Sequence, residues 1–381
     1  MVYLIGIIFL TIFAAINLTV GLRGWIIIRQ LLPFINVYLY WILFAFIALS
    51  FFLGRLGGKF LPSTVDAAFN IVGGYWIAAL YYFIILAVLL AIVKVLIKLA
   101  SSGVLFRGYN VELILNMSIF IVIFIILAYG TYNATHSKII KYDIAIDKRA
   151  GDLKNLNIVT VSDIHLGSIV GKSRLNKMIV EINGLKPDIV FLCGDIVDDD
   201  ISPFLTENMG ETFKQIKSKY GVYAVLGNHE YIGGNIQEIE KAYKEANIIL
   251  LKDGVEKVNN SFYVVGRDDV SGVRVNGKKR EDISKLIERC DKTLPIIVLD
   301  HQPVKIEEAK SAGVDLQFSG HTHKGQFFPT NLITKKIFKI DYGYLKEDKF
   351  NIIVTSGFGT WGPPIRVGSN SEIVKTEVDF K

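Results

Sequence analysis

The chain has 381 residues, of which 51% are hydrophobic, and its 42 Lys/Arg against 36 Asp/Glu give a formal net charge of +6. Only seven of these Lys/Arg and two of these Asp/Glu precede His136, so the remaining part is close to neutral. A nucleic-acid-binding domain would cluster basic residues on a soluble face, and this charge distribution therefore argues against a nucleic-acid partner and against nuclease function. Two cysteines, Cys193 and Cys290, are too few for a disulfide framework.

Four segments in the first third lack Asp, Glu, Lys and Arg: 2–22, 31–54, 67–93 and 113–135. Each is longer than the roughly 20 residues that cross a hydrocarbon core of about 30 Å. Residues 1–135 are therefore predicted to form a transmembrane domain of four helices. Polar residues within these segments include Asn17, Asn70 and Asn116, which are expected either to form hydrogen bonds between helices or to line a groove for a lipid head group.

Basic residues in the predicted loops indicate the orientation. The first and third loops carry five Lys/Arg, and the second carries two. Because short cytoplasmic loops are enriched in Lys and Arg, we expect a multi-pass plasma-membrane protein whose C-terminal domain lies outside the cytoplasm. These residues are Arg23, Arg29, Lys94, Lys98 and Arg107 in the first and third loops, and Arg55 and Lys59 in the second.

After the last span, residues 136–155 are expected to form a juxtamembrane linker with a strand at 139–146. Residues 156–381 then alternate between apolar runs typical of buried strands and stretches of helical period, a pattern that predicts an α/β domain. The expected strands are 157–161, 188–193, 222–226, 295–299, 315–318, 351–355 and 372–379. The expected helices are 173–185, 204–220, 236–246, 280–290 and 304–312.

Five of these strands are followed at once by polar motifs that read SDIH, GDIVD, GNHE, DHQP and GHTH. Five of the six histidines lie in them, and ligand sites of α/β sheets gather at the carboxyl ends of strands. In Asp163-x-His165 and His321-x-His323, alternate residues of an extended segment point the same way. Imidazole and carboxylate suit divalent ions such as Zn, Mn, Fe or Co. The pattern predicts a metal site, and Gly194, Gly227 and Gly320 would permit the close backbone approach just before the ligands.

The order of these motifs resembles that of the calcineurin-like metallophosphoesterases, over about residues 156–378. The runs GHTHKGQFFP and GFGTWGPPIR most resemble bacterial membrane-associated members with several N-terminal spans. The resemblance implies a domain built as a two-sheet β-sandwich flanked by helices, with two metal ions at the strand ends.

The resemblance also implies a role for each motif residue. It assigns Asp163, His165 and His323 to the first ion, Asn228, His301 and His321 to the second, and Asp195 to both. His229 remains as the catalytic residue that stabilises the transition state or protonates the leaving oxygen, and its ordinary pKa near neutral pH suits that task.

Three further positions are open to two interpretations each. Lys324 could contact a substrate phosphate or lie solvated at the rim, and Arg366 could bind phosphate bidentately or pair with a nearby acid. Asp198 could orient a ligand through a hydrogen bond, or the run Asp198–Asp200 could be a solvated loop.

Together these features predict a membrane-bound dinuclear phosphohydrolase that cleaves a phosphate ester or pyrophosphate by hydroxide attack. Four spans are more than a tether needs, which favours a lipid or lipid-linked substrate at the membrane surface. Two alternatives remain: hydrolysis of soluble nucleotides with the spans as a plain anchor, and a non-enzymatic sensor or scaffold.

Overall fold

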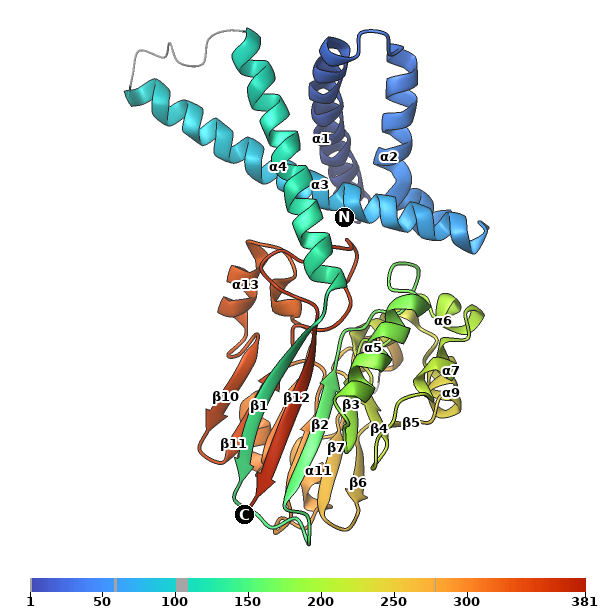
Figure 1. Ribbon diagram of the computed structural model, residues 1–381, viewed down its shortest axis with the longest axis vertical. Coiled ribbons are helices and arrows are strands. Elements are labelled where there is room, and N and C mark those ends of the chain that lie inside the picture. Colours follow the sequence, from blue (N-terminus) through green and yellow to red (C-terminus); the bar gives the residue numbers. More distant parts are fainter. Residues whose placement is uncertain (1, 58–59, 101–108, 278) are drawn as a thin grey trace. The chain divides into compact units, whose positions relative to one another are not determined.

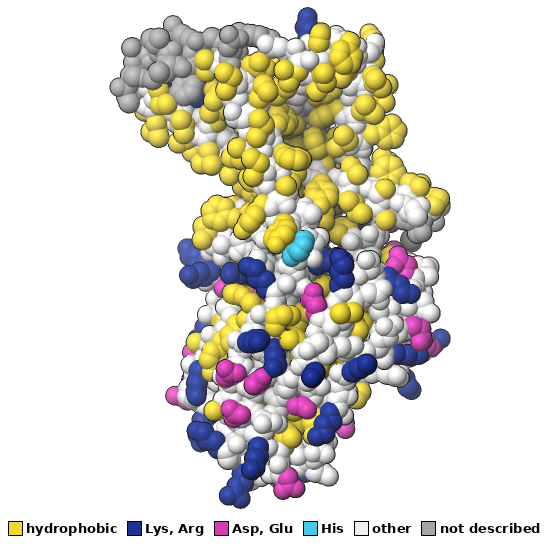
Figure 2. Space-filling model, viewed as in Figure 1, with side chains coloured by type: hydrophobic (Ala, Val, Ile, Leu, Met, Phe, Trp, Pro, Cys, Tyr) yellow, Lys and Arg dark blue, Asp and Glu magenta, His cyan; other side chains and the backbone are white. Residues whose placement is uncertain are grey.

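The computed structural model describes all residues except 1, 58–59, 101–108 and 278 (Figure 1). The chain forms two compact units, one comprising Met1–Gly130 with Gly362–Ile365 and the other comprising Thr131–Trp361 with Arg366–Lys381. Hydrophobic side chains dominate the visible face of the first unit, whereas basic and acidic side chains are scattered over that of the second (Figure 2).

The first unit consists of long apolar helices, and four helices in the described part of the chain are long and apolar enough to cross a membrane. Their bounds are α1 Val2–Leu31, α2 Val37–Gly57, α3 Ser63–Ala100 and α4 Tyr109–Thr135.

The first predicted loop is shorter than expected, because α1 continues through Arg23 and Arg29. Nothing between residues 22 and 31 breaks a helix, and Pro33 is the first residue that does. The side chain of Asn36 then accepts hydrogen bonds from the backbone N–H groups of Tyr38 and Leu39 and so caps α2. Lys59 and Arg107, expected in the second and third loops, lie outside the described residues.

The polar residues of the helices pair with one another. Asn17 accepts a hydrogen bond from the Trp76 indole (2.9 Å), which joins α1 to α3. Asn116 accepts one from Arg23 (2.7 Å), which joins α4 to α1. Asn70 donates to Asp66 within α3. Two of the three asparagines therefore form the interhelical hydrogen bonds that the sequence suggested.

The second unit is an α/β domain with two six-stranded sheets, which confirms the predicted two-sheet fold. The strand orders are β1-β12-β2-β3-β4-β5 and β10-β11-β9-β8-β7-β6. The first sheet contains β1 Lys138–Ile146, β2 Asn155–Val161, β3 Ile189–Cys193, β4 Val222–Val225, β5 Ile248–Leu250 and β12 Glu372–Phe380. The second contains β6 Gly254–Val258, β7 Phe262–Gly266, β8 Ile296–Leu299, β9 Leu316–Ser319, β10 Gly343–Glu347 and β11 Phe350–Val354.

The strand expected in the juxtamembrane linker is an integral part of the first sheet. β1 pairs with β12 in parallel over its whole length. Just before it, the carbonyl of Asn133 accepts a hydrogen bond from the backbone of Ser371. The last turn of α4 is thus held by the domain itself, and residues 138–146 form a paired strand rather than a free spacer.

Apolar side chains fill the space between the sheets, where Phe191 of β3 and Phe318 of β9 lie with ring centroids 5.6 Å apart. Helices cover the two outer faces. α5 Lys172–Gly184, α6 Ser202–Thr206, α7 Met209–Phe213 and α9 Ile236–Glu245 pack on the first sheet, and α11 Ile283–Glu288 and α12 Ile306–Ala312 pack on the second. The layers leave the carboxyl ends of the central strands free to carry the polar loops.

The single helix expected at 204–220 is wrong, because the segment contains α6 and α7 instead. Asn208 separates them in the left-handed conformation (φ 52°, ψ 47°), which asparagine tolerates better than most residues. Strands β5, β6, β7 and β10 were not predicted either. The same holds for α8 Asn228–Gly233, α10 Gly272–Asn276, the 3₁₀ turn His323–Gly325 and α13 Thr330–Ile337.

Candidate metal centre

The five polar loops meet at the carboxyl ends of β2, β3, β4, β8 and β9, which are central strands of the two sheets. Backbone hydrogen bonds join the loops that follow neighbouring strands within each sheet. Asp163 N–H donates to Gly194 O (3.0 Å), His165 N–H donates to Asp195 O (3.0 Å), and Gly320 N–H donates to His301 O (2.9 Å). The predicted ligands therefore sit on a rigid, hydrogen-bonded frame.

A first group of donor atoms comes from Asp163, His165 and His323, which are all buried and whose ligand atoms lie within 4.8 Å of one another. The Nε2 atoms of His165 and His323 are 3.1 Å apart, and Asp163 Oδ1 is 3.4 Å from the latter. Two imidazole nitrogens that both point at a carboxylate across such a short gap suit a divalent cation between them.

A second group contains Asp195, His301 and His321. Asp195 Oδ2 is 3.1 Å from His301 Nε2. Asn228 joins this group, since its Oδ1 lies 3.2 Å from His301 Nε2 and 2.7 Å from His321 Nδ1. Asp195 Oδ2 also lies 4.0 Å from His165 Nε2 of the first group. All seven predicted ligands therefore converge, with Asp195 between the two groups.

The outward-facing ring atoms support a metal at these nitrogens. His301 Nδ1 lies 2.7 Å from the Cys193 carbonyl, to which it donates a proton, and this hydrogen bond leaves a lone pair on Nε2 for coordination. His165 Nδ1 is buried and has no hydrogen-bond partner among the described residues. The buried nitrogen and oxygen donors fit Zn, Mn, Fe or Co, although they do not choose among these ions.

Protonation states in the cluster also favour cation binding. Burial lowers the pKa of His321 and, together with His165 and Arg366, lowers that of His323 well below its usual value, so both rings are neutral near pH 7. Burial alone would raise the pKa of Asp195, but His301, His165 and His229 lower it well below its usual value. His301 differs: burial would lower its pKa, but the neighbouring Asp195 carboxylate raises it well above its usual value. The site thus offers two neutral imidazoles, those of His321 and His323, near an ionised carboxylate.

Backbone strain accompanies this convergence. Asp163, His165, Asp195, His321 and His323 all have φ between 49° and 69°, a region that costs a non-glycine residue of order 1–3 kcal/mol. The glycines that precede the ligands permit close approach: a Cβ at Gly320 would lie 1.9 Å from Ser162 Oγ, and one at Gly227 would lie 2.2 Å from Asp195 Oδ1. The strained backbone lowers the stability of the fold, and in return it directs the donor atoms toward one another.

Glu230 is a site residue whose function the sequence did not reveal. Its fully buried carboxylate accepts hydrogen bonds from the backbone N–H groups of Asp195, Ile196, Val197 and Gly227 at 2.6–3.2 Å, and from the Tyr243 hydroxyl at 2.9 Å. It therefore clamps the loop after β3 to the loop after β4. The sequence shows Glu230 at the end of the GNHE motif, but only the fold shows that its carboxylate accepts hydrogen bonds from the backbone of these two loops.

His229 lies beside the first donor group, with its ring centroid 4.6 Å from that of His165. Its Nδ1 is 2.6 Å from Asp199 Oδ1 and 3.3 Å from Asp198 Oδ1. Burial would lower the pKa of His229, but these carboxylates raise it to about 10. The ring is therefore protonated at neutral pH, and its second nitrogen can donate a proton.

The acidic run after β3 is thus not a simple solvated loop. Asp198 and Asp199 both face His229, and Asp198 Oδ1 also lies 3.7 Å from His165 Nδ1. Burial alone would raise the pKa of Asp198, but the neighbouring His165 and His229 rings lower it. The structure favours the interpretation in which Asp198 orients the rings.

The structure separates the two residues for which a contact with substrate phosphate was one of two interpretations. Arg366 is fully buried, donates twice to the Gly359 carbonyl and lies 3.3 Å from His323 Nδ1, so it supports a ligand rather than meeting a substrate. The Lys324 ammonium lies 4.0 Å from the centroid of the Tyr342 ring. Lys324 is half-buried at the rim and remains a candidate contact.

Trp361 is a second residue without a predicted role. Its indole is half-exposed and lies 5.9 Å from the His229 ring, edge to face. Gln326 holds its backbone at both N–H and C=O. A rigidly held aromatic ring therefore borders the His229 ring.

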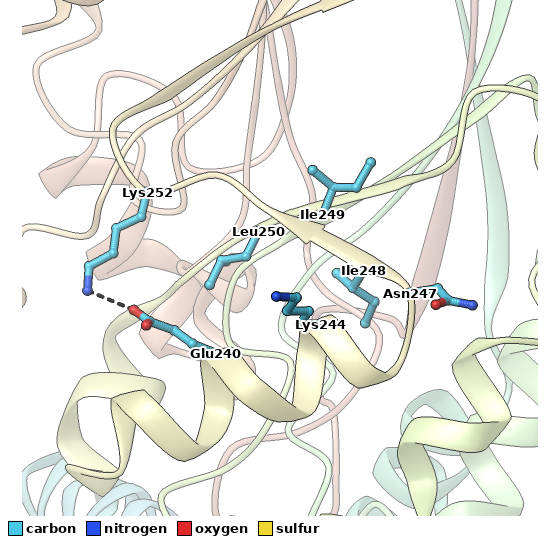
Figure 3. Close-up of a pocket in the computed structure, with 7 residues that line it drawn as sticks. All are labelled: Glu240, Lys244, Asn247, Ile248, Ile249, Leu250 and Lys252. Atoms are coloured by element: carbon cyan, nitrogen blue, oxygen red, sulfur yellow. Dashed lines mark hydrogen bonds and ion pairs between the residues drawn. The ribbon is translucent and has the colours of Figure 1, made fainter.

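An open groove elsewhere on the domain, beside α9 and β5, is chemically different (Figure 3). Its polar lining includes the Glu240–Lys252 ion pair (3.0 Å), and neither histidine nor aspartate lines it. The groove is therefore not part of the metal centre.

Comparison with known proteins agrees with this geometry. Residues 156–325 match the family described as calcineurin-like phosphoesterase. A metallophosphoesterase of Campylobacter jejuni is 31% identical over 377 residues, which cover 96% of this chain and 98% of that protein. A zebrafish (Danio rerio) transmembrane protein with a metallophosphoesterase domain is 31% identical over 261 residues, and these span 65% of this chain but only 59% of the zebrafish protein.

Among solved structures, the Haemophilus influenzae NAD nucleotidase is similar at 16% identity with a TM-score of 0.37, covering 55% of this chain and 46% of that one. The Campylobacter relative, which is matched over nearly its whole length, and the matched domain show that the chain belongs to the calcineurin-like phosphoesterase family.

Proposed function

We propose that the protein is a membrane-bound phosphohydrolase with two divalent ions. The observation that carries the proposal is the convergence of seven donor residues in two groups that share Asp195. Asp163, His165 and His323 would hold one ion, Asn228, His301 and His321 the other, and Asp195 both. When bound, the pair would supply an activated water molecule and polarise the phosphoryl oxygens.

The chain's own residues would then complete the reaction. His229 is held by Asp199 at Nδ1, so its proton on Nε2 is available for the departing oxygen. The raised pKa of His229 keeps that proton in place at neutral pH, as general-acid catalysis requires. Glu230 fixes the loop that carries Asp195, and Arg366 fixes the ring of His323.

For the substrate, we propose a phosphate ester or pyrophosphate of a lipid or lipid-linked compound. Trp361 offers a half-exposed apolar ring beside His229, and Ile232, three residues further on in α8, is also exposed. Apolar side chains so close to a polar centre suit a substrate with both a phosphate and a hydrophobic part. Membrane helices would keep the enzyme beside such substrates.

The alternatives make different predictions. If the helices were a plain anchor for an enzyme that acts on soluble nucleotides, the apolar residues near His229 would not affect turnover. If the domain were a sensor or scaffold, it would hold metals without hydrolysis. The buried catalytic histidine with its two carboxylates favours an enzyme.

A substrate screen on the detergent-solubilised full chain with Mn²⁺ would separate these cases. Lipid phosphates, lipid-linked pyrophosphates, nucleotides and an aryl phosphodiester would be compared for wild type, Trp361→Ala and the exposed control Ile249→Ala. We expect Trp361→Ala to lose about tenfold or more on lipid substrates and little on the aryl diester, with Ile249→Ala unchanged. Faster turnover of nucleotides than of any lipid would refute the lipid proposal.

We further propose that the protein lies in the plasma membrane with the domain outside the cytoplasm, because Arg23, Arg29, Lys94 and Lys98 lie toward the α1–α2 and α3–α4 connections. In intact cells, an impermeant maleimide should then label Glu245→Cys but not Phe34→Cys, which lies between α1 and α2. The native thiols are buried and should stay unlabelled. The opposite labelling pattern would reverse the orientation.

A further inference from the structure

Helix α13 (Thr330–Ile337) differs from the other helices of the second unit because none of its described residues is buried. Leu332, Ile333 and Ile337 and the preceding Phe328 are 51–69% exposed. Large apolar side chains that gather on a soluble surface commonly mark an interaction site. Figure 2 shows hydrophobic side chains gathered at the place that α13 occupies in Figure 1, next to a group of basic side chains.

The opposite side of α13 is fixed to the domain. Thr334 donates a hydrogen bond to the Asp341 carboxylate (2.8 Å), and the Thr322 hydroxyl beside the metal ligands donates to the Asp341 carbonyl. The Phe338 ring, just after the helix, lies 6.3 Å from the His321 ring. The outward apolar face is thus held rigidly by the same segment that carries the ligands His321 and His323.

α13 lies close to the point where the chain leaves the last membrane helix. Asn133 in the final turn of α4 donates a hydrogen bond to the Arg366 carbonyl, and Val367 N–H donates to the Gln326 carbonyl. A Cβ at Gly368 would lie 3.6 Å from the Phe328 Cβ, at the start of the apolar surface. All these contacts lie within the second unit, and they connect the end of a span to α13 through one short segment.

The charges on α13 indicate which partner covers it. At 100° per residue, Lys336 projects between Leu332 and Ile333 on the outward face, and both Lys335 and Lys336 are exposed. A protein partner packed on this face would have to bury the Lys336 ammonium or supply a carboxylate. At a bilayer the lysine stem can lie along the acyl chains while the ammonium reaches the lipid phosphates.

We propose that Phe328 and α13 insert into the head-group region of the bilayer that α4 crosses. The helix then acts as a second attachment of the domain beside α4. It holds the His321–His323 segment, and with it one side of the metal centre, at the lipid surface. This inference concerns a lipid-binding surface and does not depend on which phosphate ester is hydrolysed.

Spin labelling of the full chain in nanodiscs tests the proposal. A nitroxide would be attached at Ile333→Cys and, as the matched control, at Ile249→Cys, an exposed isoleucine in the edge strand β5 at the far edge of the sheet from β1. For each label we would measure the ratio of its collision rate with lipid-soluble oxygen to its collision rate with a water-soluble nickel complex. We expect this ratio to be at least threefold higher for the label at position 333 than for the control label.

Equal collision ratios at positions 333 and 249 would overturn the proposal, and so would strong spin–spin broadening at 333, because the latter would show a second copy of the chain on α13. Adding Lys335→Gln and Lys336→Gln together to the labelled chain should reduce the difference between the two collision ratios in discs that contain anionic lipid. Because these are exposed positions, folding should be preserved, and metal content provides the check. If the full chain did not hydrolyse phosphate esters while the label at position 333 still lay in the lipid, the result would count against the proposed function and leave this inference standing.

Discussion

The buried Glu230 carboxylate allows the frame of the metal centre to be tested separately from its ligands. Each of its oxygens accepts two backbone N–H groups, Oε2 from Asp195 and Gly227 and Oε1 from Ile196 and Val197. In Glu230→Gln, one oxygen becomes an NH₂ group that faces two donors. Two hydrogen bonds to a charged acceptor are lost, each worth about 1.5–3 kcal/mol.

The expected destabilisation of the domain is therefore about 3–6 kcal/mol. For a domain of this size, about 1 kcal/mol shifts the unfolding temperature by roughly 2–4 °C, so a decrease of roughly 6–24 °C is predicted. Because the same hydrogen bonds position the loop with Asp195, metal affinity should fall as well.

Thermal unfolding and bound metal would be measured on the full chain in detergent. Glu245→Gln makes the same chemical change on an exposed helix surface and should unfold like wild type. Tyr243→Phe removes only the hydroxyl partner of Glu230 and should fall between the two. If Glu230→Gln unfolded at the wild-type temperature with its metals retained, the clamp would have no structural importance and the reasoning would be refuted.

Three further predictions concern residues around the donors. His229→Gln should lower kcat by about 10²–10⁴-fold and leave metal content and KM nearly unchanged; a parallel loss of metal would instead identify His229 as a ligand. Arg366→Lys should lower the unfolding temperature and weaken metal binding, because the single lysine ammonium cannot reproduce the guanidinium's donors to Gly359 and its contact with His323; an unchanged protein with altered KM would restore it as a substrate contact. Lys324→Ala should change KM by less than about threefold, because its ammonium rests over Tyr342; a tenfold rise in KM would show that it binds phosphate.

The elements that could be predicted from the sequence are those with a regular pattern of apolar residues. Strand periodicity placed β2, β3, β4, β8 and β9 to within two residues, and the polar residues after them could then be expected to meet. Hydrophobicity identified the four long helices. Both signals are local, because they depend on residues next to one another in the chain.

The features that it missed depend on contacts between distant residues or on unusual backbone conformations. The left-handed turn at Asn208 divides the expected helix 204–220. The sequence left Arg366 open between a phosphate contact and an ion pair, whereas in the fold it donates to a carbonyl seven residues earlier. Glu230 and Trp361 carry no motif of their own, and their roles appear only when β3, β4 and the segment before residue 362 come together.

The proposed hydrolysis requires that these seven residues hold two divalent ions. The most direct test is the metal content of the purified full chain by mass spectrometry, measured together with hydrolysis of an aryl phosphodiester, for wild type and Asp195→Asn. We predict two ions per chain in active wild type, and at most one ion with activity reduced by at least 10³-fold in Asp195→Asn. Hydrolysis that persists after complete metal removal, or Asp195→Asn that keeps two ions and full activity, would contradict the account.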